Sequence, residues 1–342
     1  MPDSLYGRLP EEITSYLALD KAYRGRQIFE GMHKRGEDFS GMTSLPAALR
    51  EKLVREVPQF TTRAADTLKD PDGTVKLRVA LADEGEPCFI ECVLLETETG
   101  RKTACLSTQA GCAMGCAFCK TGTLGLRRNL EAAEIIEQFH HLSRACGPIS
   151  NIVFMGMGEP LENLAALRQS IAVFTHPHGL ALSLRRMTVS TCGIVPGILS
   201  LAEEGPAVGI AVSLVSADEE KRRRLMPSAM RWGIDELKAA LLAYQEKTGK
   251  RLTIEIVLLK GINDGKNDIR KLASWLRGLD VIVNLIPWNP VEGLGFKPPE
   301  EAAVQLYYTE LENLRIPVVR RYRRGRKIGG ACGQLGGGWV KE

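Results

Sequence analysis

The chain has 342 residues, of which 44% are hydrophobic and 25% are charged, with 45 Lys and Arg against 41 Asp and Glu. This composition, with 34 Gly and 17 Pro, excludes a disordered or collagen-like chain and predicts one large globular domain with a smaller one. The net charge of +4 permits an acidic partner such as RNA without requiring one. Apolar stretches such as residues 205–217 are shorter than the ~20 residues that a membrane span needs, and the N-terminus shows no signal peptide. We therefore expect a cytoplasmic protein with no membrane partner.

The first predicted unit is helical. Apolar residues recur at helical spacing at Ile28, Phe29 and Met32, and again at Leu49 and Leu53. We predict a small all-helical N-terminal domain over residues 1–60. Its basic residues, taken alone, are those of an ordinary solvated helix surface.

The next segment, residues 61–102, changes to a period of two. Apolar and polar residues alternate over 75–81 and again over 90–94, and the turn signals Asp72-Gly73 and Thr99-Gly100 separate these runs. The pattern predicts a short antiparallel meander that extends the main domain.

Residues 103–342 alternate between strand and helix patterns, and 131–145 and 234–244 each carry one apolar helix face. The strand patterns cover residues 103–107, 151–155, 187–191, 207–214, 252–259, 281–286 and 318–322. Repeated strand–helix units predict a parallel sheet covered on both faces. About six units are too few for a complete barrel of eight. We therefore predict an α/β fold with a partial, TIM-like (β/α)6 barrel, whose active residues lie at the C-terminal ends of the strands.

Three of the nine cysteines, Cys112, Cys116 and Cys119, fall within eight residues, next to Gly111 and Gly115. Thiolates are the usual ligands of iron–sulfur clusters, and three of them leave the fourth iron of a cubane open to a substrate. A zinc site usually has four closed ligands, and the sequence offers no second Cys-x-x-Cys or histidine pair. The spacing therefore favours a four-iron cluster in a glycine-flanked loop.

This cysteine motif after the first strand of a partial barrel resembles the radical S-adenosylmethionine (SAM) superfamily. The segments QAGCAMGCAFCKTG, NIVFMGMGEPLEN, NLIPWNP and GGACGQL, in that order, are similar to the RlmN/Cfr family of RNA adenosine methyltransferases. The N-terminal GRQIFEGMHKRGEDFSGMTSLPAALREKL resembles the accessory domain of that family. The resemblance covers nearly the whole chain. It implies a [4Fe-4S] cluster, SAM, an RNA-contacting accessory domain over 1–60, an electron donor such as flavodoxin or ferredoxin, and a monomer.

The resemblance also implies which residues contact SAM, and all of them lie near predicted C-terminal strand ends. At one position the sequence departs from the family, which usually has Ser-Leu-His where this chain has Ser213-Leu214-Val215. The implied set is Gly158, Glu159, Ser190, Ser213, Leu214, Val215 and Asn289.

Three further residues match catalytic positions of the family. Cys332, in a loop with Gly329, Gly330 and Gly333, matches the cysteine that takes a methyl group from SAM and carries it to adenine. Cys105 matches the cysteine that releases the resulting protein–RNA crosslink by forming a disulfide with Cys332. Glu91 matches the base that removes the adenine proton, and a carboxylate in so apolar a strand is costly unless it is paired.

The basic run over residues 320–327 precedes the Cys332 loop and is suited to an RNA backbone, with 127–128 and 222–224 as extensions. Methylation of carbon 2 of adenosine in ribosomal RNA, tRNA or both is the main hypothesis. The alternatives are Cfr-like methylation of carbon 8 and a non-catalytic RNA-binding iron–sulfur protein. The remaining cysteines are interpreted as small buried hydrophobic residues: Cys88, Cys92, Cys146 and Cys192.

Overall fold

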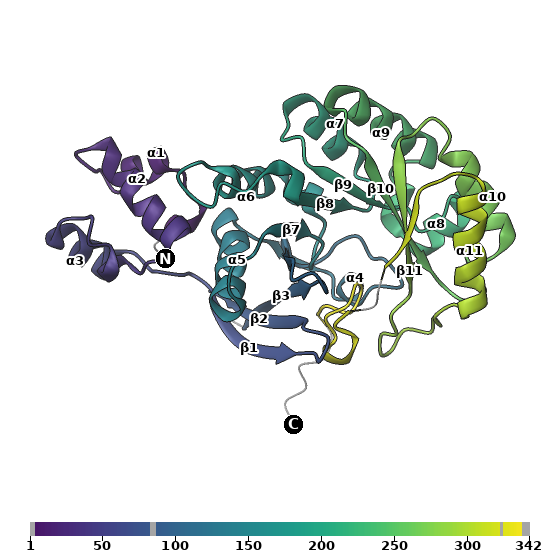
Figure 1. Cartoon of the computed structure of the whole chain (residues 1–342), viewed down its shortest axis with the longest axis horizontal. Helices are drawn as coiled ribbons and strands as arrows, with labels where there is room; N and C mark the ends of the chain where they lie inside the picture. Colours follow the sequence, from purple (N-terminus) through teal and green to yellow (C-terminus); the bar gives the residue numbers. More distant parts are fainter. Residues whose placement is uncertain (1–3, 83–86, 322–323, 337–342) are drawn as a thin grey trace.

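A computed structural model describes residues 4–82, 87–321 and 324–336 (Figure 1). Its main feature is a ten-stranded sheet in the order β1-β2-β3-β4-β7-β8-β9-β10-β11-β12. The strands are β1 (Arg63–Lys69), β2 (Val75–Leu81), β3 (Cys88–Glu96), β4 (Lys102–Cys105), β7 (Asn151–Phe154), β8 (Met187–Thr191), β9 (Gly209–Ser213), β10 (Leu252–Leu258), β11 (Val281–Pro287) and β12 (Val318–Arg320).

The sheet consists of an antiparallel part and a parallel part that meet at β4. Strands β1, β2 and β3 form an antiparallel meander, and β3 pairs with β4 in the same sense. From β4 to β12 every neighbouring pair is parallel. Because β1 and β12 stand at opposite ends of the strand order, the sheet is an open, partial barrel. The predicted α/β fold is confirmed, and β1 and the small hairpin of β5 (Gln109–Gly111) with β6 (Leu126–Asn129) are additions to it.

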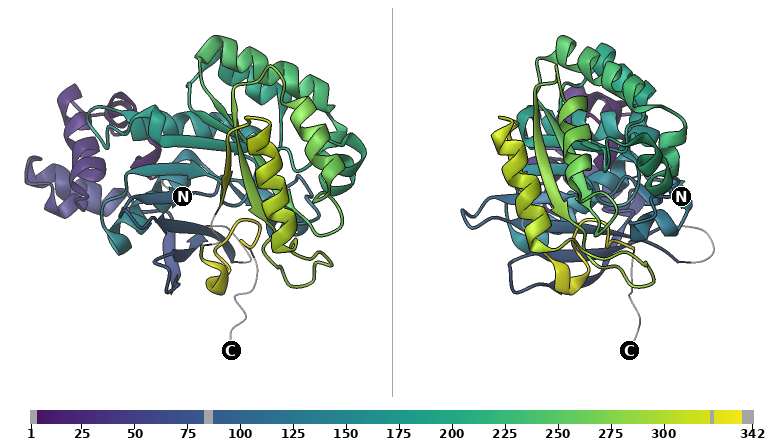
Figure 2. Two further views of the ribbon diagram at one scale, coloured as in Figure 1. Left: turned by 45° about the vertical axis from the view of Figure 1, so that its right-hand side comes forward. Right: turned by 90° about the vertical axis from the view of Figure 1, so that its right-hand side faces the viewer.

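Helices connect the parallel strands and cover the outside of the curved sheet (Figures 1 and 2). They are α5 (Ala132–Cys146), α6 (Leu164–Thr175), α7 (Val195–Glu204), α8 (Glu219–Leu225), α9 (Ile234–Thr248), α10 (Lys266–Trp275) and α11 (Glu301–Asn313), besides the short α4 (Lys120–Thr123). The apolar periodicity of α5 explains its placement, since Ile135, Phe139 and Leu142 are buried against the sheet. No helix within the described ranges has the length and apolarity needed to cross a membrane.

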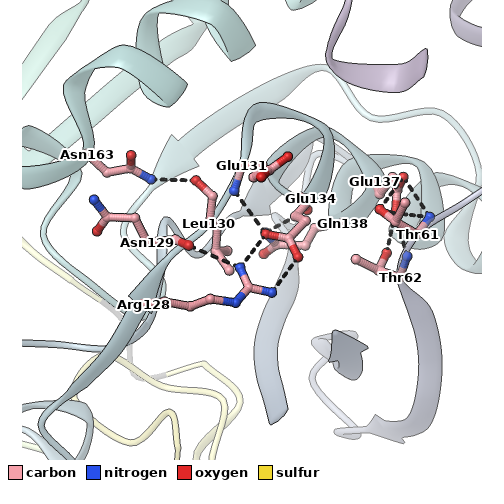
Figure 3. A network of polar contacts seen from close by, with 10 residues as sticks. All are labelled: Thr61, Thr62, Arg128, Asn129, Leu130, Glu131, Glu134, Glu137, Gln138 and Asn163. Atoms are coloured by element: carbon pink, nitrogen blue, oxygen red, sulfur yellow. Dashed lines mark hydrogen bonds and ion pairs between the residues drawn. The ribbon is translucent and has the colours of Figure 1, made fainter. Parts of the chain in front are cut away.

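The N-terminal segment is helical, as the periodicity predicts. It consists of η1 (Leu5–Gly7), α1 (Pro10–Tyr16), α2 (Ala22–Glu30), a π-helical turn η2 (Gly31–Arg35), η3 (Phe39–Gly41) and α3 (Ala47–Glu56). Its chain leads into β1 beside α5, where the buried Glu137 carboxylate accepts hydrogen bonds from the backbone amides of Thr61 and Thr62 (Figure 3). The Thr62 hydroxyl donates to the same carboxylate at 2.6 Å. Together, these bonds compensate a charge that would otherwise be costly to bury.

Candidate active site

The carboxyl ends of the parallel strands share one edge of the sheet, and the residues predicted to be functional gather there. Cys105 is the last residue of β4, and Ser213 is the last residue of β9. Ser190 lies one residue before the end of β8, while Gly158 and Asn289 lie in the loops after β7 and β11. Because neighbouring strands run parallel, residues far apart in the sequence meet at this edge.

The cysteine loop is held in place by backbone contacts. Gly111 and Gly115, which flank Cys112, have φ values of +80° and +66°, a conformation that glycine adopts without strain. A Cβ atom on Gly111 would lie 1.9 Å from the carbonyl oxygen of Gly125, so no larger residue fits there. The amide of Cys112 donates to that same carbonyl at 2.8 Å.

The three thiols of the loop lie within eight residues, and Cys119 contributes to the raised pKa of both Cys112 and Cys116. Burial and the charges of the neighbouring cysteines raise the pKa of Cys116, and burial raises the pKa of Cys112 to about 11. In the part of the chain that the structure describes, no three His, Cys, Asp or Glu side chains are arranged to hold a single metal ion. A cubane needs a wider arrangement, since each thiolate binds a different iron atom. The three thiols Cys112, Cys116 and Cys119 therefore fit an iron–sulfur cluster better than a closed zinc site.

The loop after β7 carries two of the predicted SAM contacts. Gly158 has φ +101°, and an added Cβ would lie 2.5 Å from the Cβ of Gln109, so only glycine fits. The buried Glu159 carboxylate accepts hydrogen bonds from the amides of Leu161 (3.1 Å) and Cys192 (2.8 Å). It therefore joins the loop after β7 to the loop after β8, and burial raises its pKa.

Val215, the residue that departs from the family pattern, is fully buried and has φ +63°. This left-handed conformation is unfavourable for a β-branched residue. Two hydrogen bonds hold it: the Val215 amide donates to the Glu255 carbonyl at 3.2 Å, and the Asn263 side chain donates to the Val215 carbonyl at 2.8 Å. The local backbone is thus determined by the surrounding structure and not by the residue type.

Asn289 gives a direct indication of a missing binding partner. Its Nδ2 atom donates to the Cys332 carbonyl at 3.1 Å, while its buried Oδ1 atom has no hydrogen-bond partner among the described residues. Buried polar atoms are rarely left unpaired. SAM offers amino and hydroxyl donors, so an acceptor at the strand edge fits that cofactor.

The two predicted catalytic cysteines lie close enough for Cys332 to contribute to the pKa of Cys105. Burial raises the pKa of Cys105 to about 12, with a further contribution from Cys332 and an opposing one from Arg321. The side chain of Cys332 is exposed, and desolvation raises its pKa while Arg321 opposes that effect. Arg321 itself pairs with the buried Glu255 at 3.1 Å.

All nine cysteines are free thiols, so the disulfide between Cys105 and Cys332 that the resemblance implies is not present in the structure. The prediction of a standing disulfide bond is therefore not supported. The buried Cys88, Cys92 and Cys192 agree with their interpretation as small hydrophobic residues, whereas Cys146 is only partly buried.

Glu91, on β3, is fully inside the protein and forms an ion pair with Lys76 on β2. The Lys76 Nζ atom lies 3.2 Å from Glu91 Oε1, and both side chains are at most 3% exposed. The pair also holds the C-terminal loop, because Lys76 donates to the Gly329 carbonyl (3.3 Å) and the Gly336 amide donates to Glu91 Oε2 (2.9 Å). Glu91 thus contacts the loop that carries Cys332.

Further bonds join this C-terminal loop to the cysteine loop. The Lys120 amide donates to the Gly333 carbonyl at 2.8 Å, and the Thr121 hydroxyl donates to the Leu335 carbonyl at 2.7 Å. The loop after β11 contacts the cysteine loop as well, because the ring nitrogen of Trp288 donates to the Phe118 carbonyl at 2.8 Å. The structure thus places the Cys332 loop between β2–β3 on one side and the cysteine loop on the other.

Some residues of the basic run 320–327 contact other parts of the protein, and others are exposed to solvent. Arg321 faces the two cysteines, and the Arg324 guanidinium donates to the Glu96 carbonyl at 2.6 Å. Arg326 and Lys327 are exposed. Tyr322 and Arg323 lie outside the described residues.

The predicted extensions of the basic surface, residues 127–128 and 222–224, are only partly free to contact RNA. Arg128 forms a two-pronged ion pair with Glu134 on α5 (Figure 3), with both N–O distances 2.7 Å. Arg222 is buried, so including it in an RNA-contacting surface was wrong.

Sequence analysis did not assign roles to Lys76 and Glu255, or connect Arg222 and Arg321 with the cysteines. The sequence offered one signal for Lys76, which is a charged residue between two apolar ones in the run 75–81. The other pairings join residues that only the fold brings together.

The radical SAM superfamily profile matches residues 106–276. The solved structure of a radical SAM methyltransferase from Sphaerobacter thermophilus superposes with a TM-score of 0.93 at 39% identity, covering 98% of this chain and 99% of that one. The probable dual-specificity RNA methyltransferase RlmN of Treponema pallidum is 46% identical over 333 residues, 97% of each chain. The chain belongs to the RlmN family. A Thermus thermophilus protein of the same name is 43% identical over 96% of this chain and 91% of that one.

Membership of the RlmN family makes this chain a radical SAM RNA methyltransferase and confirms the predicted family, fold and enzyme class. The [4Fe-4S] cluster and SAM are the cofactors of radical SAM enzymes, so the predicted cofactors are confirmed as well. The comparisons leave the individual site residues as predictions, which rest on the contacts described above.

Proposed function

We propose that the protein methylates carbon 2 of adenosine in ribosomal RNA, in tRNA, or in both. The observation that supports this most is the arrangement around the Cys332 loop. The Gly336 amide of that loop donates to Glu91, Cys332 contributes to the raised pKa of Cys105, and the cysteine loop is bonded to the same segment. A cluster with a purely structural role would need none of these three residues.

In this proposal Cys112, Cys116 and Cys119 hold the cluster, and SAM binds at the strand edge. The side chain of Asn289 and the segments around Gly158, Ser190 and 213–215 would contact SAM. When bound, the cluster and SAM supply a deoxyadenosyl radical, with one electron from a donor such as flavodoxin or ferredoxin.

The protein's own residues then carry the methyl group and the proton. The Cys332 sulfur would accept a methyl group from one SAM, and that methyl group would give a hydrogen atom to the deoxyadenosyl radical made from a second SAM. Its carbon would then add to carbon 2 of adenine, which crosslinks RNA to Cys332. The adduct would return one electron to the cluster, and its carbon 2 proton would pass to the Glu91 carboxylate. A thiolate of Cys105 attacks the Cys332 sulfur. The sulfur–sulfur bond forms as the sulfur–carbon bond breaks, and the released carbon takes up a proton to become the methyl group.

The proposal requires the thiol of Cys105 to ionise within a site that raises its pKa. Arg321 is the group that opposes this effect at both Cys105 and Cys332. Its guanidinium would stabilise the attacking thiolate, and Glu255 holds that guanidinium in place. The transient disulfide agrees with two free thiols in the resting protein.

We also infer that RNA lies across residues 1–60, the first of three units, and the exposed Arg326 and Lys327 beside the Cys332 loop. The other units are 61–102 and 103–342. The target adenosine must leave its base stack to reach Cys332, because that thiol lies among the loops of the strand edge. A monomer in the cytoplasm is sufficient for this arrangement.

Mass spectrometry of nucleosides tests the function. The reconstituted, reduced enzyme is incubated with ribosomal RNA and with tRNA, and the RNA is digested to nucleosides. We expect 2-methyladenosine with the native protein and none with Cys332→Ala. 8-Methyladenosine would replace the proposal with carbon 8 chemistry, and no methyladenosine from either RNA would contradict a catalytic role.

A further inference from the structure

Arg222, in α8, is a buried cation that forms no ion pair with any residue that the structure describes. Its side chain is only 2% exposed, although its neighbours in the run of three arginines face solvent. No carboxylate within the described ranges lies at ion-pairing distance, because the nearby Glu219 pairs with Arg223 at 2.7 Å. Burying an unpaired charge is strongly unfavourable, so proteins normally supply a partner.

The guanidinium also has unused hydrogen-bond donors. Its Nη2 atom donates to the Cys192 carbonyl at 2.6 Å, which fixes the orientation of the planar group. Its Nε and Nη1 atoms are buried and have no hydrogen-bond partner among the residues described. The N–H groups of two of its three nitrogen atoms therefore remain available to acceptors, and a guanidinium favours anionic acceptors.

The position of these donors identifies the kind of acceptor. Cys192, whose carbonyl binds Arg222, donates its amide to the Glu159 carboxylate in the loop after β7 at 2.8 Å. The end of α8 is also fastened to the cysteine loop, since the Ala117 amide donates to the Leu225 carbonyl at 2.9 Å. The unpaired cation therefore stands beside the loop whose thiols fit an iron–sulfur cluster.

We propose that Arg222 is a positioning residue for the cofactors, and that its free Nε–H and Nη1–H groups donate to the anionic assembly that forms at the cysteine loop. This inference rests on the proposed cluster ligands and not on the position at which adenine is methylated. The acceptor is either a sulfur of the cluster or the carboxylate of SAM. Both carry negative charge, and hydrogen bonds and charge near the sulfurs set the reduction potential of such clusters.

The two acceptors predict different effects of removing the charge. A cluster held by three thiolates gains negative charge when it is reduced, so a nearby cation favours the reduced form. Removing that cation would make the reduction potential more negative without SAM present. If the SAM carboxylate is the acceptor, the same change would weaken SAM binding by about tenfold or more, the usual effect of losing a charge-assisted hydrogen bond.

The test compares Arg222→Met, Arg222→Lys and the matched control Arg223→Met, which removes an exposed arginine from the adjacent position of the same helix. Each protein is reconstituted anaerobically with iron and sulfide. The reduction potential is measured without SAM by a titration followed by electron paramagnetic resonance. The dissociation constant of SAM is measured by equilibrium dialysis on the oxidised holoprotein.

We expect Arg222→Met to change at least one of these two quantities, Arg222→Lys to fall between it and the native protein, and Arg223→Met to match the native protein. A lower potential identifies the cluster as the acceptor, and weaker SAM binding identifies the carboxylate. Native values of both quantities in Arg222→Met would overturn the proposal.

Thermal unfolding of the cluster-free proteins separates this role from simple structural support. Arg222→Met loses one hydrogen bond to a carbonyl, but it also removes an unpaired buried charge. We therefore expect the cluster-free variant to unfold at a temperature no lower than that of the native protein. A clear loss of stability without the cluster, with both cofactor measurements unchanged, would show that Arg222 only supports the fold. Because neither measurement uses RNA, the result does not depend on whether carbon 2 is methylated.

Discussion

Replacing Lys76 by Met is expected to destabilise the protein strongly. Lys76 and Glu91 are both at most 3% exposed, and their side chains lie 3.2 Å apart, so the substitution removes one charge of a buried ion pair and keeps the other. Breaking a buried ion pair by removing one partner costs about 3–5 kcal/mol. The free energy of unfolding of the cluster-free Lys76→Met protein should fall by about that amount in urea titrations followed by tryptophan fluorescence.

Two control variants separate the effect of the buried charge from the loss of a lysine side chain. Lys247→Met removes an exposed ion pair with Glu203 and should cost less than about 1 kcal/mol. The double variant Lys76→Met/Glu91→Gln removes both charges but keeps an oxygen that accepts the hydrogen bond of the Gly336 amide. Because no charge is then left unpaired, this variant should recover most of the lost stability.

The result that would refute this reasoning is equal stability loss in Lys76→Met and Lys247→Met. A double variant less stable than Lys76→Met would also contradict it, since it would show that the Glu91 carboxylate is not the destabilising group. Lys76 also holds the Gly329 carbonyl, so the single variant should expose the C-terminal loop to limited proteolysis sooner than native protein does.

Four further predictions concern the cofactors, the crosslink and pH. Cys116→Ala should lose the visible absorbance and most of the iron of the reconstituted cluster, and a full iron content would contradict the ligand assignment. Cys105→Ala, expressed in cells, should purify with covalently attached RNA, whereas Cys105→Ala/Cys332→Ala should not; a single unshifted band without nuclease-sensitive species in the first variant would exclude the crosslink. Val215→His should change the binding free energy of SAM by only about 1 kcal/mol, measured by equilibrium dialysis, because His tolerates the left-handed backbone at this position and adds one hydrogen bond. Burial lowers the pKa of His140 to about 3, so the unfolded chain takes up its proton near pH ~6.5 while the folded protein does not. Protonation of His140 in the unfolded chain therefore does not lower the free energy of unfolding above pH ~6.5, and lowers it progressively as the pH falls toward 3. His140→Gln should flatten the dependence of the melting temperature on pH in this range.

The sequence by itself determined the features that depend on short-range spacing. The period of two over 75–81 and the strand pattern over 187–191 correspond to β2 (Val75–Leu81) and β8 (Met187–Thr191), because side-chain direction follows local backbone geometry. The three-cysteine loop could also be predicted, since its ligands lie within eight residues and the flanking glycines allow the turns. The alternation of strands and helices was sufficient to predict a partial barrel with an active edge.

Only the tertiary structure decided which distant residues meet. A run of arginines looks uniform in the sequence, yet Arg222 is buried beside the cysteine loop while Arg223 faces solvent. Arg321 belongs to a second basic run, but β12 places it against Glu255 on β10, where it also acts on the pKa of Cys105. The energy of a charge depends on the surface that packs over it and on the partners within a few ångströms, and strands from separate parts of the chain supply both.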